Sequence, residues 1–172
     1  METFEAITSR KSTRDYPDEQ ITKPQLKKII LAAQAAPVAM GKYKDFHLTF
    51  IQNQKKIEKL ESFIDKQPYY GAPTVVIISA LQSKKGQVNF EDSLGAGIIA
   101  ENIALEATDL GLATCDILGA IVMGLNKNNG LIKEIGVPDG FRPYLSVVLG
   151  NKKNKYEQRN IPDNRIPLNF VH

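Results

Sequence analysis

A long apolar segment in the second half of the chain restricts most strongly what this chain can fold into. From about Glu91 to Leu110, hydrophobic residues surround much of a helical cylinder, and Gly111 follows as a typical left-handed helix cap. A helix that is apolar on most sides has to be covered on most sides. Small residues allow a close neighbour: Gly95, Ala96, Gly97 and Ala100. We therefore expect this helix in a domain core or between two copies of the chain.

Short hydrophobic runs predict a sheet beside that helix. Thr74–Ala80 is almost continuously apolar, as in a strand covered on both faces, and Tyr144–Leu149 is a second core strand. Over 46–50, hydrophobic residues alternate with polar ones, which predicts a strand with one buried face carrying Phe46, Leu48 and Phe50. Helical patterns cover residues 3–9, from Thr22 to before Pro37, around Ile57–Ile64, and two brief stretches before Gly136.

Composition narrows the class of protein. The 172 residues fit one domain, 1–172, and the net charge of +3 is too small to indicate a nucleic-acid partner. No apolar run approaches the roughly 20 residues that span a bilayer, so we expect no membrane partner. Cys115 is the single cysteine and lies in an apolar stretch, which favours a buried thiol, a cytoplasmic location and no zinc site.

The densest group of potential ligands follows the first predicted helix. Residues 9–16 read Ser-Arg-Lys-Ser-Thr-Arg-Asp-Tyr, and on an extended segment Arg10, Ser12 and Arg14 share one face. Arginine forks and hydroxyl groups suit the oxygens of a phosphate. A solvated loop is the plainer interpretation. A small α/β module that holds another phosphate or a nucleic acid there is a further alternative.

Several motifs together resemble the FMN-dependent nitroreductase family. The Arg-Lys-Ser-Thr-Arg run after a short helix looks like the opening motif of that family, and five more segments follow in its order, over nearly the whole chain. They are Ala36–Ala39, Gly71–Pro73, Asp92 at the start of the long helix, Gly111–Cys115, and Gly150 with its basic, proline-containing tail. The resemblance implies an α+β fold with a mostly antiparallel central sheet flanked by helices. It also implies an intertwined homodimer in which the C-terminal tails are exchanged.

The resemblance also implies roles for individual residues. Arg10, Lys11 and Ser12 match positions at the FMN phosphate and ribityl chain, and Arg14 matches a basic residue near the pyrimidine end of the ring. Arg165 matches a C-terminal cation that reaches the phosphate, whereas Asp163 stands where many relatives carry a second cation. Two further segments match residues that surround the ring. They are Pro37, Val38 and Ala39, supplied by the partner subunit, and Leu118 and Gly119, next to the reactive nitrogen N5.

The function implied is that of an FMN-dependent oxidoreductase, with the chemistry on flavin N5 and no catalytic side chain required. NADH or NADPH would reduce the flavin, and a small planar acceptor such as a nitroaromatic or quinone would then take the same place, in a ping-pong order. An alternative is a flavin-binding storage protein or redox sensor with little turnover. The two alternatives share the phosphate-binding residues, so the sequence separates them poorly.

Overall fold

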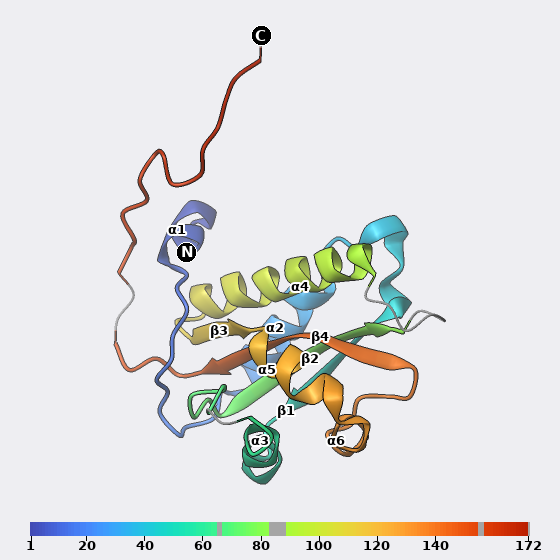
Figure 1. Ribbon diagram of the computed structural model, residues 1–172. Coiled ribbons are helices and arrows are strands. Elements are labelled where there is room, and N and C mark those ends of the chain that lie inside the picture. Colours follow the sequence, from blue (N-terminus) through green and yellow to red (C-terminus); the bar gives the residue numbers. More distant parts are fainter. Residues whose placement is uncertain (65–66, 83–88, 155–156, 172) are drawn as a thin grey trace.

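A computed structural model describes residues 1–64, 67–82, 89–154 and 157–171. Figure 1 shows a central sheet with helices on both faces. The sheet has four strands in the order β1-β2-β4-β3, and every neighbouring pair is antiparallel. The strands are β1 (Phe46–Ile51), β2 (Thr74–Leu81), β3 (Ala113–Ile117) and β4 (Phe141–Gly150). The predicted α+β class with a mostly antiparallel sheet is confirmed.

The helices form two layers, one on each face of the sheet. One face is covered by α2 (Lys23–Gln34) and α4 (Phe90–Asp109), whose apolar residues pack with Val76, Ile78, Val147 and Leu149. The other face packs against α3 (Gln54–Glu61), α5 (Gly119–Met123) and α6 (Asn129–Glu134). The remaining helical segments are α1 (Thr3–Ser9) and three 3-10 turns, Ala39–Gly41, Tyr43–Asp45 and Leu125–Lys127.

The predicted helix ends follow from local chemistry. Thr22 accepts a hydrogen bond from the Gln25 backbone, and the Gln25 side chain accepts one from the Thr22 backbone, so α2 begins with a capping box. The long helix α4 ends as expected, because Gly111 adopts a φ of 74°, which residues with a Cβ adopt reluctantly. The core position of α4 is also confirmed, since Ile103 and Ala107 are completely buried.

Two strand predictions need correction. β4 begins at Phe141, three residues before the predicted start, and it includes Pro143. β3 pairs only with the stretch Ser146–Gly150 of β4, so Pro143 lies where the strand has a free edge and its missing N–H costs no ladder bond. The register against β2 shifts beside it, which leaves Tyr144 as the extra residue of a bulge.

The second correction concerns the faces of β1. Its most buried side chains are Thr49 and Ile51, whereas Phe46, Leu48 and Phe50 are only half-buried. β1 is an edge strand that pairs with β2 on one side. The three predicted residues do pack against the core beside α2, but they also line an open pocket there, and this pocket explains their partial exposure.

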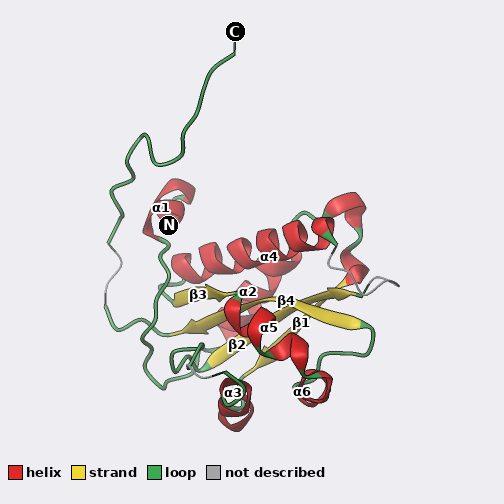
Figure 2. Ribbon diagram, in the orientation of Figure 1, coloured by secondary structure: helices red, strands yellow, loops and turns green. Residues whose placement is uncertain are grey.

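The C-terminal segment leaves the body of the molecule. After β4 it runs past α1 and then away from the sheet without regular structure, as Figures 1 and 2 show. Its apolar residues are exposed: Ile161, Ile166, Leu168 and Phe170. Apolar side chains are also exposed along α4, at Phe90, Leu94 and Ile98. Within the described ranges, no helix combines the length and hydropathy needed to cross a membrane.

Tyr69 is a fully buried phenol between the sheet and the loop after α3. Burial raises its pKa to about 12, and a side-chain hydrogen bond with Ser146 acts in the opposite direction. Because the neutral phenol is favoured in the folded state, this stabilisation is present below the unfolded pKa near 10. Above that pH the free energy of unfolding falls, by up to about 3 kcal/mol in all as the pH reaches about 12.

We expect Tyr69 to remain protonated in the native protein when exposed tyrosines ionise. The measurement is the pH dependence of tyrosinate absorbance in the native protein, compared with a Tyr69→Phe variant. The absorbance curves of the two native proteins should coincide up to about pH 11. Only above that pH should they differ, by the absorbance of one tyrosinate. A difference between the curves that titrates near pH 10 would contradict the burial of Tyr69.

Candidate functional site

The predicted phosphate-binding segment lies along the outer edge of β3. Ser12 forms an isolated parallel bridge with Thr114, and the Thr13 backbone N–H donates to the Thr114 carbonyl at 2.9 Å. The Tyr16 hydroxyl group donates to the Thr13 carbonyl at 2.7 Å. These contacts fasten residues 12–16 to β3 and to one another.

The three side chains that were expected to share a face all lie near the Cys115 thiol. Burial raises the pKa of Cys115, and a hydrogen bond with Ser12 opposes that shift, followed by the charges of Arg14 and Arg10. Cys115 is buried, as predicted, and its raised pKa keeps it a neutral thiol at pH 7. The Ser12 hydroxyl group and the charges of Arg14 and Arg10 thus act on the same thiol of β3.

Arg10 lies between two carboxyl groups. Its Nε atom is 3.8 Å from Glu101 Oε1 of α4, and its charge also lowers the pKa of Asp116 on β3. Burial is the larger effect on both acids and raises the pKa of each. The sequence did not indicate either acid, because Glu101 and Asp116 stand in separate elements that only the fold brings to Arg10.

Residues after β4 add cations to the same edge. Lys152 lies close to Lys11: burial lowers the pKa of Lys152, and the neighbouring charge of Lys11 lowers it further. Lys153 instead forms an ion pair with Asp15, with a distance of 2.6 Å between Nζ and Oδ1. Both lysines of this loop therefore lie near the predicted segment, and the charge of Lys153 is offset there by Asp15.

Arg159 connects the two ends of the chain. Its Nε and Nη2 atoms donate to the carbonyls of Thr8 and Ile7, at 3.0 and 2.9 Å, at the end of α1. Burial lowers the pKa of Arg159, and the charges of Arg10 and then Arg165 lower it further. The charges of Arg10 and Arg165 thus act on one guanidinium group.

Tyr70 is another residue whose position the sequence left open. The Arg14 guanidinium carbon lies 5.8 Å from the centre of its ring, a cation–π contact. Its backbone has a φ of 55°, in the left-handed region that a bulky residue adopts only at a cost in energy. Gly71 follows with a φ of 72°, so the glycine of the Gly-Ala-Pro motif permits this turn.

The residues predicted to surround a ring fall into two separate groups. Leu118 and Gly119 form the beginning of α5, and Leu118 lines an apolar pocket of about 370 Å³ between α4, α5 and the free edge of β4. Val38, between Pro37 and Ala39, lines a different pocket of about 490 Å³ with Tyr43 and Phe46. A single chain does not bring the two groups around one cavity.

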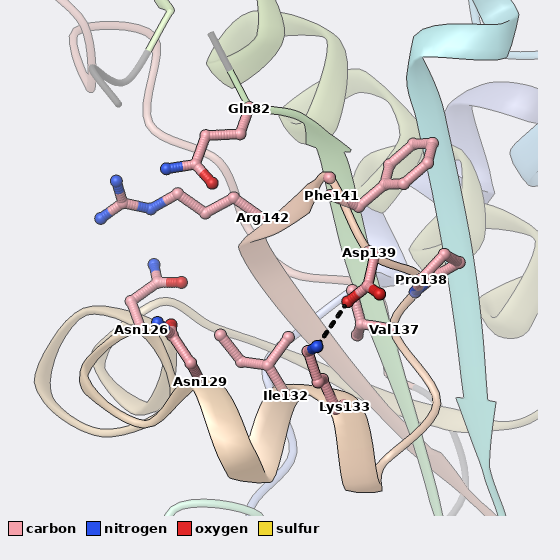
Figure 3. Close-up of a pocket in the computed structure, with 11 residues that line it drawn as sticks. Gln82, Asn126, Asn129, Ile132, Lys133, Val137, Pro138, Asp139, Phe141 and Arg142 are labelled. Carbon is pink, nitrogen blue, oxygen red and sulfur yellow. Dashed lines mark ion pairs between the residues drawn. The ribbon is translucent and has the colours of Figure 1, made fainter. Parts of the chain in front are cut away.

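A third pocket, of about 260 Å³, is polar and contains none of the predicted residues. Figure 3 shows the side chains of Gln82, Asn126 and Arg142 reaching toward one side of it, and Lys133 paired with Asp139 at 3.0 Å. Asn126 also lines the apolar pocket beside Leu118. In the part of the chain that the structure describes, no group of three or more His, Cys, Asp or Glu residues could hold a metal ion.

Comparison with known proteins connects this geometry to a family. Residues 2–160 match the family model described as "Putative TM nitroreductase". A Methanothermobacter thermautotrophicus protein named "Putative NADH dehydrogenase/NAD(P)H nitroreductase" is 27% identical over 160 residues, covering 87% of this chain and 77% of the relative. A Bacillus subtilis protein named "FMN reductase (NAD(P)H)" is 23% identical over 170 residues, covering 90% and 67%.

Solved structures agree with these matches. The structure of a nitroreductase with bound FMN from Bacteroides fragilis superposes with a TM-score of 0.80 and 26% identity, covering 99% of this chain and all of that one. An FMN-bound nitroreductase from Desulfitobacterium hafniense gives a TM-score of 0.81 at 22% identity, covering 99% and 98%. The family resemblance stated from the motifs is confirmed. The chain belongs to the nitroreductase family, whose family model matches residues 2–160.

Proposed function

We propose that this protein is an FMN-dependent enzyme that oxidises NADH or NADPH and reduces small planar acceptors such as nitroaromatics or quinones. One observation carries the proposal: Arg159 is hydrogen-bonded to the end of α1, within range of the charges of Arg10 and Arg165, which come from opposite ends of the chain. Family membership and the FMN-bound relative from Bacteroides fragilis support FMN as the anion that these cations hold.

The donor set fits a flavin phosphate. Five cations from both chain ends act on the region between the β3 edge and the end of α1, and the acids near them include Glu101 and Asp116. The cations are Arg10, Lys11, Lys152, Arg159 and Arg165. A phosphate monoester carries about −1.5 to −2 charges at pH 7, which would offset this excess. Arginine forks bind its oxygens in pairs, and the Ser12 hydroxyl group can donate at the same place.

Other residues of the chain would position the ring. We assign Arg14, above Tyr70, to the pyrimidine end, where a fixed positive charge stabilises negative charge that develops during turnover. Within α5, the first backbone hydrogen bond runs from the Ile121 N–H to the Leu118 carbonyl, at 3.0 Å. The N–H groups of Leu118 and Gly119 precede it and are the donors that we assign to N5.

The apolar pocket beside Leu118 suits a planar substrate. FMN, when bound, supplies hydride chemistry at N5. Ile121 and Val122 of α5 and Tyr144 of β4 line the pocket, so they would exclude water from a flat ligand. Nicotinamide and acceptor would use this pocket in turn, which is the ping-pong order. Asn126, at the polar end, would bind a polar substituent of either ligand.

A second copy of the chain would complete the site. The exposed apolar residues Phe90, Leu94 and Ile98 lie on α4, and the tail carries Ile166, Leu168 and Phe170. Both surfaces are ready to be covered by a partner. Because Val38 and Leu118 line different pockets in one chain, we infer that Pro37–Ala39 of a partner close the ring site. The tails would be exchanged in the same homodimer.

The experiment starts with the purified protein and its visible absorption spectrum. We expect bound FMN, which loses its colour promptly when NADH or NADPH is added without oxygen and regains it when a quinone or nitroaromatic follows. Initial rates at several acceptor concentrations should give parallel double-reciprocal lines, as a ping-pong order requires. A colourless protein that takes up no added FMN would contradict the proposal, and slow bleaching of a fully loaded protein would favour flavin storage.

A further inference from the structure

The tail is fastened to α1 at one point, just before the predicted phosphate segment. The Arg159 backbone N–H and its Nε atom both donate to the Thr8 carbonyl, each at 3.0 Å, and Nη2 donates to the Ile7 carbonyl at 2.9 Å. The neighbouring Gln158 side chain donates to the Thr8 hydroxyl oxygen at 2.8 Å. Carbonyls at a helix C-terminus attract cations, so this contact is favourable.

These bonds fix the guanidinium group without using all of it. An arginine carries five N–H donors, and the side-chain bonds to Thr8 and Ile7 involve Nε and Nη2. The Nη1 group takes part in neither bond. Arg10 follows two residues after Thr8, so the guanidinium group is fixed to the backbone just before the first arginine of the phosphate segment.

Bringing like charges together costs free energy unless an anion joins them. Arg159 is held at the end of α1, where burial lowers its pKa, the charges of Arg10 and Arg165 lower it further, and the charge of Glu101 raises it. Asp163 occupies the tail position where the family resemblance led us to expect a second cation. In this chain the additional cation of the tail is therefore Arg159, which stands four residues before Asp163 and is hydrogen-bonded to the end of α1.

We propose that Arg159 binds the FMN phosphate together with Arg10 and thereby selects FMN over riboflavin, which lacks that phosphate. The inference rests on the proposed function. It adds a ligand that no motif indicated, and it gives the α1 contact of the tail a role in cofactor choice: the carbonyls of Ile7 and Thr8 hold the guanidinium group, and its remaining N–H donors bind the phosphate.

The test measures the dissociation constants of FMN and riboflavin for the full-length protein by quenching of flavin fluorescence. In Arg159→Gln we expect the FMN constant to rise on the order of 10-fold or more, because a charge-assisted contact is lost. The riboflavin constant should change by less than about 3-fold. The salt dependence of FMN binding should also weaken, because one charge fewer faces the phosphate.

Two control variants separate this role from simpler ones. Gln158→Ala removes a tail–α1 hydrogen bond without changing charge, and Lys133→Gln removes a cation on α6. Both should keep the wild-type ratio of FMN to riboflavin affinity. If Arg159→Gln weakens both flavins equally, Arg159 only fastens the tail and the inference is wrong. If the wild-type protein binds no FMN, the proposed function itself fails, which is a different result.

Discussion

Replacing Arg10 and Arg165 together by alanine should reduce FMN affinity by about 10²- to 10⁴-fold. Each arginine would make charge-assisted hydrogen bonds to the phosphate, worth roughly 1.5–3 kcal/mol apiece, and the two side chains come from opposite chain ends. The fold should persist. Arg10 makes a long, partly exposed ion pair with Glu101 at 3.8 Å, and such pairs contribute about 0–1 kcal/mol to the free energy of unfolding.

The measurement is the FMN content of the purified variant and its dissociation constant for FMN, beside its thermal unfolding temperature. The matched control is Lys59→Ala with Lys133→Ala, which also removes two cations, both from surface ion pairs with Glu134 and Asp139. The control should retain its flavin. Wild-type FMN affinity in the Arg10 and Arg165 double variant would refute the phosphate assignment.

Replacing Leu94 by aspartate should convert the proposed homodimer into monomers and release the flavin. Leu94 is 53% exposed on α4, with Ile98 one turn further on. A carboxylate buried there against a second copy would lie among apolar side chains without a partner. Such a charge costs about 3–5 kcal/mol, so the dimer dissociation constant should rise at least about 100-fold. FMN should be lost in parallel because the monomer would lack the partner residues that are proposed to cover the flavin ring.

Phe63→Asp is the matched control for this change. Phe63 is 47% exposed and closely follows α3, and α3 lies on the face of the sheet opposite α4 (Figure 1). Its replacement also puts an aspartate in place of an exposed apolar residue, but away from the proposed interface. Light scattering should give a dimer for the wild type and Phe63→Asp, and a monomer for Leu94→Asp. A Leu94→Asp dimer with full flavin content would exclude α4 as the interface.

Much of the fold was predictable because local signals coincide with elements. Thr22 with Gln25 begins α2, and Gly111 ends α4, since capping and left-handed geometry depend on adjacent residues. The start of β4 was not predictable, because Pro143 normally breaks a strand. It is tolerated here only because β3 is too short to reach it, and the length of a neighbouring strand is not a local property.

The candidate site divides in the same way. Arg10, Ser12 and Arg14 stand in one short segment, so the sequence could group them, whereas their place near Cys115 of β3 depends on the fold. Arg159 could not be grouped with them, because its position depends on carbonyls of α1 about 150 residues earlier in the chain. The roles of Pro37, Val38 and Ala39 stay predictions, since Val38 lines a pocket of its own and the partner's position is not encoded within one chain.

The backbone of Tyr70 sets a limit on how this protein could be made more heat-resistant. A left-handed conformation costs an ordinary residue roughly 1–2 kcal/mol, and glycine or asparagine avoids much of that cost. An engineer guided by backbone geometry would therefore exchange residue 70 early. The exchange would also remove the aromatic ring over which Arg14 lies. A substitution at residue 70 that raises the stability of the fold would therefore disturb the candidate site.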